Sequence, residues 1–225
     1  MTVDAGRIFV VDDDAGVRKA LERLLRAAGR ASETFASADA VIERLPHERP
    51  SCLVLDVRLP GLSGIDLQRE LTRNGSAVPI VFITGHGDVT MGVEAMKAGA
   101  VDFLQKPFDN AALLEAIDRA VDRHERHRGA EAQVATLRAR FASLTPRERE
   151  VCDRVASGLR NRQIADELQI SEKTVKVHRS RVMEKMHAGS LAGLVRMARE
   201  LEVAQHPAGP MPVPTAETDT DEGTR

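Results

Sequence analysis

Five short apolar runs alternate with amphipathic stretches over residues 7–122. Short apolar runs bounded by turn-forming residues are typical of strands buried on both faces of a sheet. The amphipathic stretches between them are typical of crossover helices. We therefore predict an α/β domain built on a doubly wound, five-stranded parallel sheet. Its strands are expected near residues 7–11, 31–35, 52–56, 80–83 and 101–104.

The residues between these runs carry the expected helix signals. Val17, Leu21 and Leu24 recur at helical spacing before Gly29, which suits the left-handed end of a helix. Ser37 precedes the next amphipathic stretch, and Asp109 precedes the last one, so each can cap the helix that follows. Five strands alternating with five helices would complete a small domain.

A different pattern, helical throughout, begins after residue 143. The motif Leu144-Thr-Pro-Arg-Glu148 has the features of a helix start, with a capping box and a proline in the first turn. Asn161 and Ser171 are the predicted caps of the next two helices, which a three-residue break separates. A fourth helix is expected over residues 190–202. This arrangement predicts a small all-α, four-helix domain with a helix-turn-helix at its centre.

The segment that joins the two patterns is polar and rich in alanine. Gly129 interrupts it, and Val134, Leu137 and Phe141 then follow at helical spacing. We predict a helical linker that either pairs with a second copy of itself or packs against the following domain. The last part of the chain combines prolines, threonines and acidic residues without periodicity, which predicts a disordered tail. The predicted divisions are 5–124, 125–143 for the linker, 144–204 and 205–225 for the tail.

The two predicted domains differ in charge. Residues 1–124 carry 15 Lys and Arg against 19 Asp and Glu, whereas residues 144–204 carry 12 against 9. A basic second domain is consistent with a nucleic-acid partner. Cys52 and Cys152 stand in apolar stretches and are interpreted as buried, reduced thiols. Because no apolar run approaches the roughly 20 residues that span a bilayer and no secretory signal is recognisable, we expect no membrane partner and a cytoplasmic protein.

Polar and charged side chains close the predicted strands. The sequence Asp12-Asp13-Asp14 follows the first strand, Asp56 ends the third and Thr84 follows the fourth. Lys106 follows the fifth strand, and its bond to Pro107 can be cis. The carboxyl ends of parallel strands meet at one edge of the sheet, where such sheets bind their ligands. We therefore expect these side chains to form one site.

This set of side chains suits a magnesium ion beside a carboxylate that accepts a phosphoryl group. Mg²⁺ prefers oxygen ligands, which Asp12, Asp13 and Asp56 would supply. Asp56 is also interpreted as the nucleophile toward phosphorus. Lys106 would pair with the phosphoryl oxygens, and the Thr84 hydroxyl would donate a hydrogen bond to one of them.

Simpler roles exist for each of these residues. The three aspartates could cap the first helix, and Lys106 could be a solvated lysine. Such roles would have to coincide at the ends of several strands, which favours a shared site. A phosphatase of the haloacid-dehalogenase type is a further alternative, through Asp12-x-Asp14, Thr84 and Lys106. It would require another acidic pair after a later strand and would leave Asp56 without a role.

The predicted helix over residues 172–186 is strongly basic, with five Lys and Arg against two Glu. Val175, Val182 and Met186 fall on one stripe that we expect to be buried. The opposite face, which includes Lys176, is expected to be polar and cationic. A helix of this kind can place its outer face against base edges in the DNA major groove. From charge alone, a solvated surface helix is the alternative.

Four motifs in residues 7–122 stand in a recognisable order and spacing. They are Val-Val-Asp12-Asp13-Asp14, Asp56-Val-Arg-Leu-Pro60-Gly61, Ile83-Thr84-Gly-His-Gly87 and Asp102-Phe103-Leu-Gln-Lys106-Pro107. Through them this segment resembles the receiver domain of two-component response regulators. The resemblance implies that a sensor histidine kinase phosphorylates Asp56 with Mg²⁺ bound. It also implies that the backbone carbonyl of Arg58 is a metal ligand and that Thr84 and Phe103 form a coupled switch.

Residues 144–200 resemble the LuxR-type helix-turn-helix domain. The resemblance is carried by Leu144-Thr-Pro-Arg-Glu148, by Asn161-x-x-Ile164-Ala165 and by Ser171-x-x-Thr174-Val175-Lys-x-His178. It implies base or backbone contacts to DNA from six residues. We expect His178 to be packed or to contact a phosphate, since no second metal ligand stands at a suitable spacing. The residues expected to contact DNA are Lys173, Thr174, Lys176, Val177, Ser180 and Arg181.

Taken together, the two segments resemble the NarL/FixJ family of response regulators, on its FixJ-like branch. The resemblance implies a transcriptional regulator, not an enzyme, that becomes a homodimer when phosphorylated and binds double-stranded promoter DNA. RNA polymerase is a further partner that it suggests. A phosphorelay intermediate whose second domain binds a protein remains the alternative.

Overall fold

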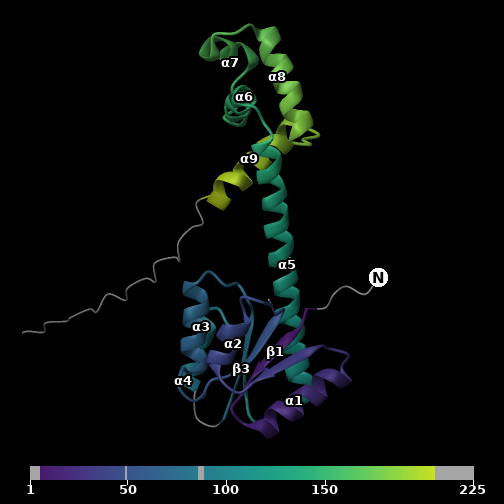
Figure 1. Ribbon diagram of the computed structural model, residues 1–225. Coiled ribbons are helices and arrows are strands. Elements are labelled where there is room, and N and C mark those ends of the chain that lie inside the picture. The colour runs from purple at the N-terminus through teal and green to yellow at the C-terminus, as the bar shows by residue number, and fades with distance from the viewer. Residues whose placement is uncertain (1–5, 49, 86–88, 206–225) are drawn as a thin grey trace, which may run out of the picture. The chain divides into compact units, whose positions relative to one another are not determined.

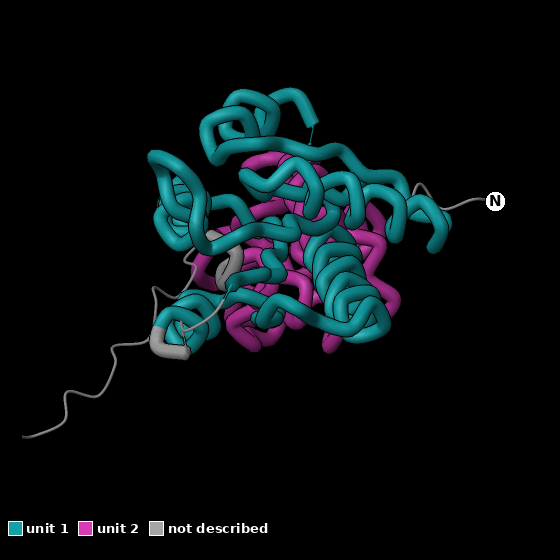
Figure 2. Tube along the Cα trace, turned by 90° about the horizontal axis from the view of Figure 1, so that it is seen from below, with its two compact units in different colours: residues 1–130 teal, residues 131–225 magenta. Residues whose placement is uncertain are grey.

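The computed structural model describes residues 6–48, 50–85 and 89–205 (Figure 1). The chain divides into two compact units, residues 1–130 and residues 131–225 (Figure 2). The sequence predicts a disordered tail over residues 205–225, but Gln205 is the last helical residue of the second unit. The rest of the tail lies outside the described residues, as do His86 and Gly87 of the third receiver motif. In the part of the chain that the structure describes, no helix is long and apolar enough to cross a membrane.

The first unit contains a parallel sheet with the strand order β2-β1-β3-β4-β5, as the sequence predicts. The order reverses between β1 and β3, and the crevice at such a reversal is where doubly wound sheets bind ligands. β1, β3 and β4 are buried along their whole length, whereas the edge strands β2 and β5 are partly exposed. The strands are β1 (Ile8–Val11), β2 (Ser32–Phe35), β3 (Cys52–Asp56), β4 (Ile80–Thr84) and β5 (Asp102–Gln105).

Alternate residues of the strands pack into two separate apolar layers, one on each face of the sheet. Phe9, Leu55 and Phe82 lie in the layer covered by α2, α3 and α4. Val10 and Val54 lie in the opposite layer, which α1 and α5 cover. The helices are α1 (Ala15–Ala27), α2 (Ala38–Arg44), α3 (Gly64–Arg73), α4 (Val89–Lys97) and α5 (Asn110–Ala142).

The predicted helix signals of the first unit are confirmed. Gly29 has a left-handed φ of 71° directly after α1. The Ser37 hydroxyl accepts a hydrogen bond from the first turn of α2, and the Asp109 carboxylate accepts one from Ala111 N. The capping role weighed for the aspartate triplet belongs to Asp14, which accepts hydrogen bonds from the first N–H groups of α1.

Gly129 does not interrupt the helix that contains it. α5 continues through it as one helix of 33 residues, so the fifth receiver helix and the predicted linker helix are a single element. A Cβ at Gly129 would meet nothing within 4 Å, which places this glycine on an open helix face. Of the two roles left open for the linker, the described residues support packing. Leu137 is buried in the core of the second unit, and Phe141 packs against that core.

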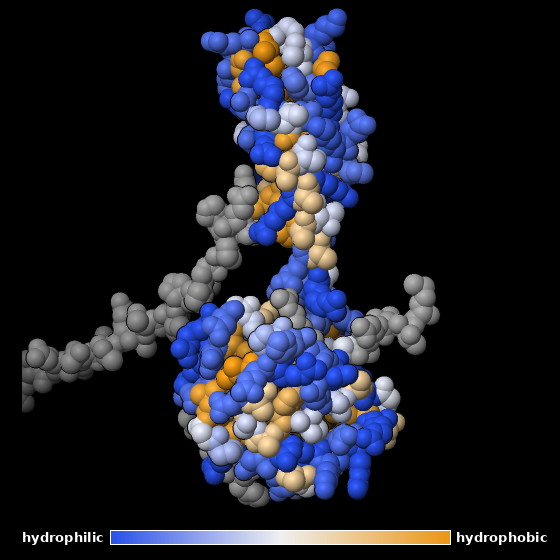
Figure 3. All heavy atoms as spheres, in the orientation of Figure 1, coloured by the Kyte–Doolittle hydropathy of each residue, from blue (hydrophilic) through white to orange (hydrophobic). Residues whose placement is uncertain are grey.

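The second unit has four further helices, as predicted. Val175, Val182 and Met186 of the basic helix are buried in a common core with residues of the other three. Gln169 has a left-handed φ of 54° at the turn between α7 and α8, which together form the predicted helix-turn-helix. On the face seen in Figure 3, hydrophilic side chains predominate over smaller hydrophobic groups in this unit. The helices are α6 (Pro146–Ala156), α7 (Asn161–Leu168), α8 (Glu172–Lys185) and α9 (Leu191–Gln205).

The helix starts of the second unit follow the sequence with one correction. Thr145 and Glu148 form the predicted capping box, and the Ser171 hydroxyl caps α8. The expectation that Asn161 caps α7 is wrong, because Arg160 holds the capping position and Asn161 is the first helical residue. The physical reason is that the Gln163 side chain accepts from Arg160 N, which satisfies the helix start, while Asn161 Oδ1 accepts from Arg179 instead.

Glu148 makes the second unit sensitive to acid. It is only 2% exposed, and its carboxylate lies 2.6 Å from Lys185 Nζ and accepts from Thr145 N. The hydrogen bond from Lys185, followed by that from Thr145, lowers the pKa of Glu148 to about 2. A lowered folded-state pKa stabilises the fold above the unfolded pKa, and this stabilisation is lost as pH falls from about 4.5 toward 2.

We predict that acidification over this range removes up to about 3 kcal/mol from the stability of the second unit. Glu148→Gln should be destabilised at pH 7 and should lose much of this pH dependence. Urea denaturation followed by circular dichroism, with hydrogen exchange locating the change, measures both. The control is Glu167→Gln, whose carboxylate is about half exposed and pairs with Arg154 on the surface. Equal pH profiles for the two variants would contradict the prediction.

Candidate functional site

Three carboxylates meet at the reversal of strand order in the first unit. Asp12 and Asp13 directly follow β1, and Asp56 is the last residue of the adjacent strand β3. One carboxylate oxygen from each lies within 4.8 Å of the other two. Asp12 and Asp56 are buried, whereas Asp13 is exposed, so the cluster opens to solvent on one side. The predicted convergence of these residues is therefore present.

Lys106 reaches the same cluster from the end of β5. Its Nζ lies 2.6 Å from Asp12 Oδ2 and 2.6 Å from Asp56 Oδ2. Burial disfavours the charged amine, yet the hydrogen bonds to both carboxylates hold the pKa of Lys106 above its ordinary value. Burial also raises the pKa of Asp12 and outweighs the opposing effect of the lysine. The bond between Lys106 and Pro107 is cis, which is one of the two forms that a bond before proline can take.

Backbone groups orient the two buried carboxylates. Asp12 Oδ1 accepts from Asp14 N at 2.9 Å, and Asp56 Oδ1 accepts from Arg58 N at 3.0 Å. The start of α3 lies against the end of β3, where a Cβ at Gly64 would be only 2.2 Å from the Asp56 carbonyl oxygen. Glycine is therefore required at this position if Asp56 is to keep its place.

The predicted switch residues occupy neighbouring strands. Thr84, at the end of β4, is 1% exposed, and its hydroxyl has no hydrogen-bond partner among the described residues. A buried hydroxyl without a partner is costly, and it would gain from an acceptor brought to the strand end. Phe103 on β5 is half-buried, and its ring lies so close to Gly92 of α4 that a Cβ there would be 3.1 Å from two ring atoms.

The acidic cluster fits a hard divalent cation. Its three carboxylates offer oxygen ligands, and the exposed side at Asp13 leaves room for the water molecules that Mg²⁺ retains. Lys106 already neutralises part of the charge on two of these carboxylates. The donor set therefore suits Mg²⁺ better than a metal that prefers nitrogen or sulfur ligands.

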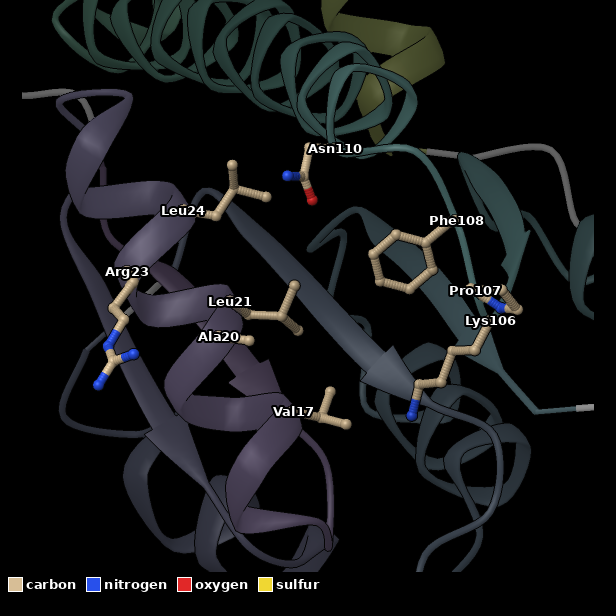
Figure 4. A pocket seen from close by; sticks show the side chains of 9 residues that line it. All are labelled: Val17, Ala20, Leu21, Arg23, Leu24, Lys106, Pro107, Phe108 and Asn110. Atoms are coloured by element: carbon tan, nitrogen blue, oxygen red, sulfur yellow. The ribbon is translucent and has the colours of Figure 1, made fainter.

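A mainly apolar cleft of about 480 Å³ lies beside this site, between α1 and the β5–α5 connection (Figure 4). Val17, Leu21 and Leu24 line one side of it, and Pro107 and Phe108 line the other. Lys106 contributes to the lining, but none of the three carboxylates does. The cleft therefore adjoins the acidic cluster, with Lys106 as the residue that they share.

In the second unit, α8 presents the residues predicted to contact DNA. Lys173, Lys176 and Arg181 are exposed, as is Ser180, and Thr174 is partly exposed at the first turn. Val177 is 45% exposed, which is unusual for a large apolar side chain and suits contact with a thymine methyl group. A buried apolar stripe opposite a cationic face is the arrangement expected of a helix that enters a groove.

The two helices of the helix-turn-helix are tied together by a polar contact. Arg179 of α8 donates to Asn161 Oδ1 at 2.9 Å, so this arginine serves the interior of the motif rather than its outer face. His178 is partly buried, and its Nδ1 is buried without a hydrogen-bond partner among the described residues. The packed role expected for His178 agrees with this placement.

Comparisons with known proteins identify both units. Residues 8–118 match the response regulator receiver domain, and residues 142–198 match the bacterial regulatory proteins of the luxR family. Nodulation protein W of Bradyrhizobium diazoefficiens is 49% identical over 197 residues, which cover 88% of this chain and 87% of that protein. The transcriptional regulatory protein FixJ of the same organism is 47% identical over 193 residues, covering 86% and 94%.

Solved structures agree with this relationship. The response regulator StyR has a TM-score of 0.75 at 49% identity, covering 86% of this chain and 98% of that one. Full-length FixJ from B. japonicum has a TM-score of 0.55 at 45% identity, covering 88% and 98%.

The fold and the two sites thus define a regulator with a receiver domain and a helix-turn-helix domain. The chain belongs to the FixJ-type response regulators of two-component systems, which carry a LuxR-type DNA-binding domain. This family consists of DNA-binding transcriptional regulators and not of enzymes, so the phosphatase alternative is set aside. The two domains imply a histidine kinase and DNA as partners.

Two polar contacts in the first unit, one at the site and one between α3 and α4, are not evident from the sequence. The Arg18 side chain donates to the backbone carbonyl oxygens of Asp12 and Asp13. Gln68 of α3 is buried and donates from Nε2 to the Ala95 carbonyl of α4 at 3.2 Å. Both lie on amphipathic helices among other polar residues, and nothing in their spacing distinguishes a side chain that turns back toward a loop or inward.

We predict that Asp13→Asn weakens cation binding and raises the stability of the metal-free chain. Three carboxylates this close repel one another, so removing one charge should raise the stability of the metal-free first unit by about 1 kcal/mol. Mg²⁺ should raise the melting temperature of the wild-type chain by binding the folded state, and should do so far less in the variant.

Scanning calorimetry with and without Mg²⁺ measures both effects and needs no aromatic probe, because the chain has neither Trp nor Tyr. Asp39→Asn removes an exposed carboxylate from α2 and is the control. An Asp13→Asn protein that Mg²⁺ stabilises as much as it stabilises the wild type would refute this assignment.

Proposed function

We propose that Asp56 accepts a phosphoryl group and that this modification controls DNA binding by α8. The observation that carries the proposal is the placement of the Asp56 carboxylate, which is nearly buried at the site and hydrogen-bonded to Lys106 Nζ at 2.6 Å. A carboxylate oxygen of Asp56 attacks phosphorus, and the bond from phosphorus to the kinase histidine nitrogen breaks as the new bond forms. Lys106 pairs with the charge on the transferred oxygens.

The proposed cation ligands are Asp12, Asp13 and Asp56, together with the backbone carbonyl of Arg58. Mg²⁺ bound there would neutralise charge on the phosphoryl oxygens during transfer. The geometric support is the convergence of the three carboxylates within 4.8 Å. The hydrogen bond from Arg58 N to Asp56 Oδ1 keeps the Arg58 peptide beside the cluster.

The proposed switch transmits the modification to α4. The Thr84 hydroxyl has no hydrogen-bond partner among the described residues, so a phosphoryl oxygen on Asp56 offers it an acceptor. Movement of Thr84 changes the space available to Phe103, whose ring lies against Gly92 of α4. Such a change matters only if it biases two alternative arrangements of the domain.

We further propose that the phosphorylated chain dimerises through the surface formed by α4, β5 and α5. Val93 and Met96 of α4 are 49% and 45% exposed, and they are the large apolar side chains of the described first unit that stand out to solvent. Covering them in an interface would remove apolar surface from water. A homodimer would present two copies of α8 to a pseudo-palindromic promoter site.

The DNA-contacting set proposed for α8 is Lys173, Thr174, Lys176, Val177, Ser180 and Arg181. The exposed cations would pair with phosphates, and the outer face would read base edges. With DNA as its target, we place the protein in the cytoplasm, with RNA polymerase as a further partner.

We predict that acetyl phosphate with Mg²⁺ adds about 80 Da, one phosphoryl group, to the intact wild-type chain. Asp56→Asn should gain no such mass, because an amide oxygen is a poor nucleophile. Intact-mass spectrometry is the measurement, and Asp39→Asn is the control with one exposed carboxylate removed. Phosphorylation of Asp56→Asn to the wild-type level would exclude Asp56 as the acceptor.

A second prediction concerns α8. A Lys173→Ala/Lys176→Ala chain should bind DNA at least tenfold more weakly, and the slope of log affinity against log salt should fall by about one for each lost phosphate contact. Lys19→Ala/Arg26→Ala removes the same charge from α1, outside the proposed dimer surface, and should bind like the wild type.

Duplexes selected in vitro on the wild-type chain serve as the probe, and fluorescence anisotropy at several salt concentrations gives the affinities. Equal DNA affinity of the α8 variant and the wild type would favour the alternative in which the second domain binds a protein.

A further inference from the structure

The turn after β1 brings two consecutive acidic side chains to the same cluster, which regular strand geometry forbids. In a strand, neighbouring side chains point to opposite faces. Asp12 and Asp13 nevertheless place carboxylate oxygens within 4.8 Å of each other, directly after β1 ends at Val11. Something must hold the backbone of this turn in its irregular conformation against the repulsion of the two charges.

Arg18 is placed to do this. Its Nη1 donates to the carbonyl oxygen of Asp12 at 2.6 Å and to that of Asp13 at 2.9 Å. One nitrogen therefore fixes the direction of two successive carbonyl groups. Helical side chains lean toward the N-terminus of their helix, so the fourth residue of α1 covers the loop that precedes it.

The position of Arg18 is otherwise unfavourable. A cation near a helix N-terminus opposes the helix dipole and so destabilises the helix. The first turn of α1 contains no acidic residue that would compensate, and the Asp14 cap is engaged with the N–H groups of Gly16 and Val17. The hydrogen bonds to the two carbonyl groups offset this cost, and Arg18 is partly buried where it makes them.

We propose that Arg18 is a positioning residue for the cation site, which holds the main chain of Asp12 and Asp13 so that their carboxylates converge. The inference rests on the proposed function of that cluster and adds a residue that would not itself touch the cation. Other bonds anchor the neighbouring atoms, such as Asp12 N to the Phe35 carbonyl and Asp14 N to Asp12 Oδ1. Arg18 acts on the two carbonyl groups between them.

Electrostatics and positioning predict opposite signs for the loss of Arg18. If the arginine were only a nearby positive charge, removing it would reduce repulsion and tighten cation binding. If it holds the turn, removing it costs convergence and weakens binding. Residues that orient the ligands of a metal without touching it typically contribute a factor of about 10–100 to metal affinity.

The test uses the full chain and Mn²⁺ alone, with electron paramagnetic resonance reporting free Mn²⁺ and no phosphodonor present. Arg18→Gln should bind Mn²⁺ about tenfold more weakly than the wild type. Arg18→Lys keeps the positive charge but not the planar guanidinium. Its affinity for Mn²⁺ should lie between those of Arg18→Gln and the wild type. Arg23→Gln is the matched control, because Arg23 lies on the same helix and points away from Lys106 (Figure 4). It should bind as tightly as the wild type or slightly more tightly.

A second readout does not involve the cation. Hydrogen exchange at the Asp14 amide, which donates to Asp12 Oδ1, should accelerate in metal-free Arg18→Gln and not in Arg23→Gln. Melting temperatures show whether each variant is folded. If Arg18→Gln is unfolded, Arg18→Lys is compared with the wild type in its place. Unchanged or tighter Mn²⁺ binding by a folded Arg18 variant would overturn the inference. Failure of the wild-type chain to bind Mn²⁺ would instead overturn the cation site itself.

Discussion

The gathering of three carboxylates at one sheet edge is the constraint on which the first unit depends. Like charges this close repel, and the chain sets Lys106 against two of them at 2.6 Å. Backbone N–H groups donate to the other carboxylate oxygen of Asp12 and of Asp56, and the absence of a side chain at Gly64 lets α3 start against the Asp56 carbonyl. This arrangement suits the proposed divalent cation and phosphoryl group. The repulsion among the three carboxylates lowers the stability of the fold.

The same strand ends link the proposed phosphorylation of Asp56 to the surface of α4. Thr84 stands beside the cluster with a buried hydroxyl that lacks a hydrogen-bond partner among the described residues. Phe103, on the next strand, lies against Gly92 of α4, and the same helix carries the exposed Val93 and Met96. The proposed path from Asp56 to this surface therefore crosses only Thr84 and Phe103 before it reaches α4.

Much of this arrangement could be predicted from the sequence, for identifiable reasons. Runs of apolar residues locate strands buried on both faces, and parallel topology forces Asp12, Asp56 and Lys106 to one edge. Asn161 has the side chain of a good capping residue but does not cap α7, because it accepts a hydrogen bond from Arg179 instead. The contacts of Arg18 and the continuity of α5 through Gly129 depend on tertiary surroundings that no local pattern encodes.

The central claim is that phosphorylation of Asp56 changes the association state of the chain. Size-exclusion chromatography with light scattering, on the wild type and on Asp56→Ala with and without acetyl phosphate and Mg²⁺, tests it most directly. The account predicts that the wild-type monomer becomes a dimer only when both reagents are present, and that Asp56→Ala stays a monomer throughout. A phosphorylated wild-type chain that remains a monomer, or a variant that dimerises equally well, would contradict it.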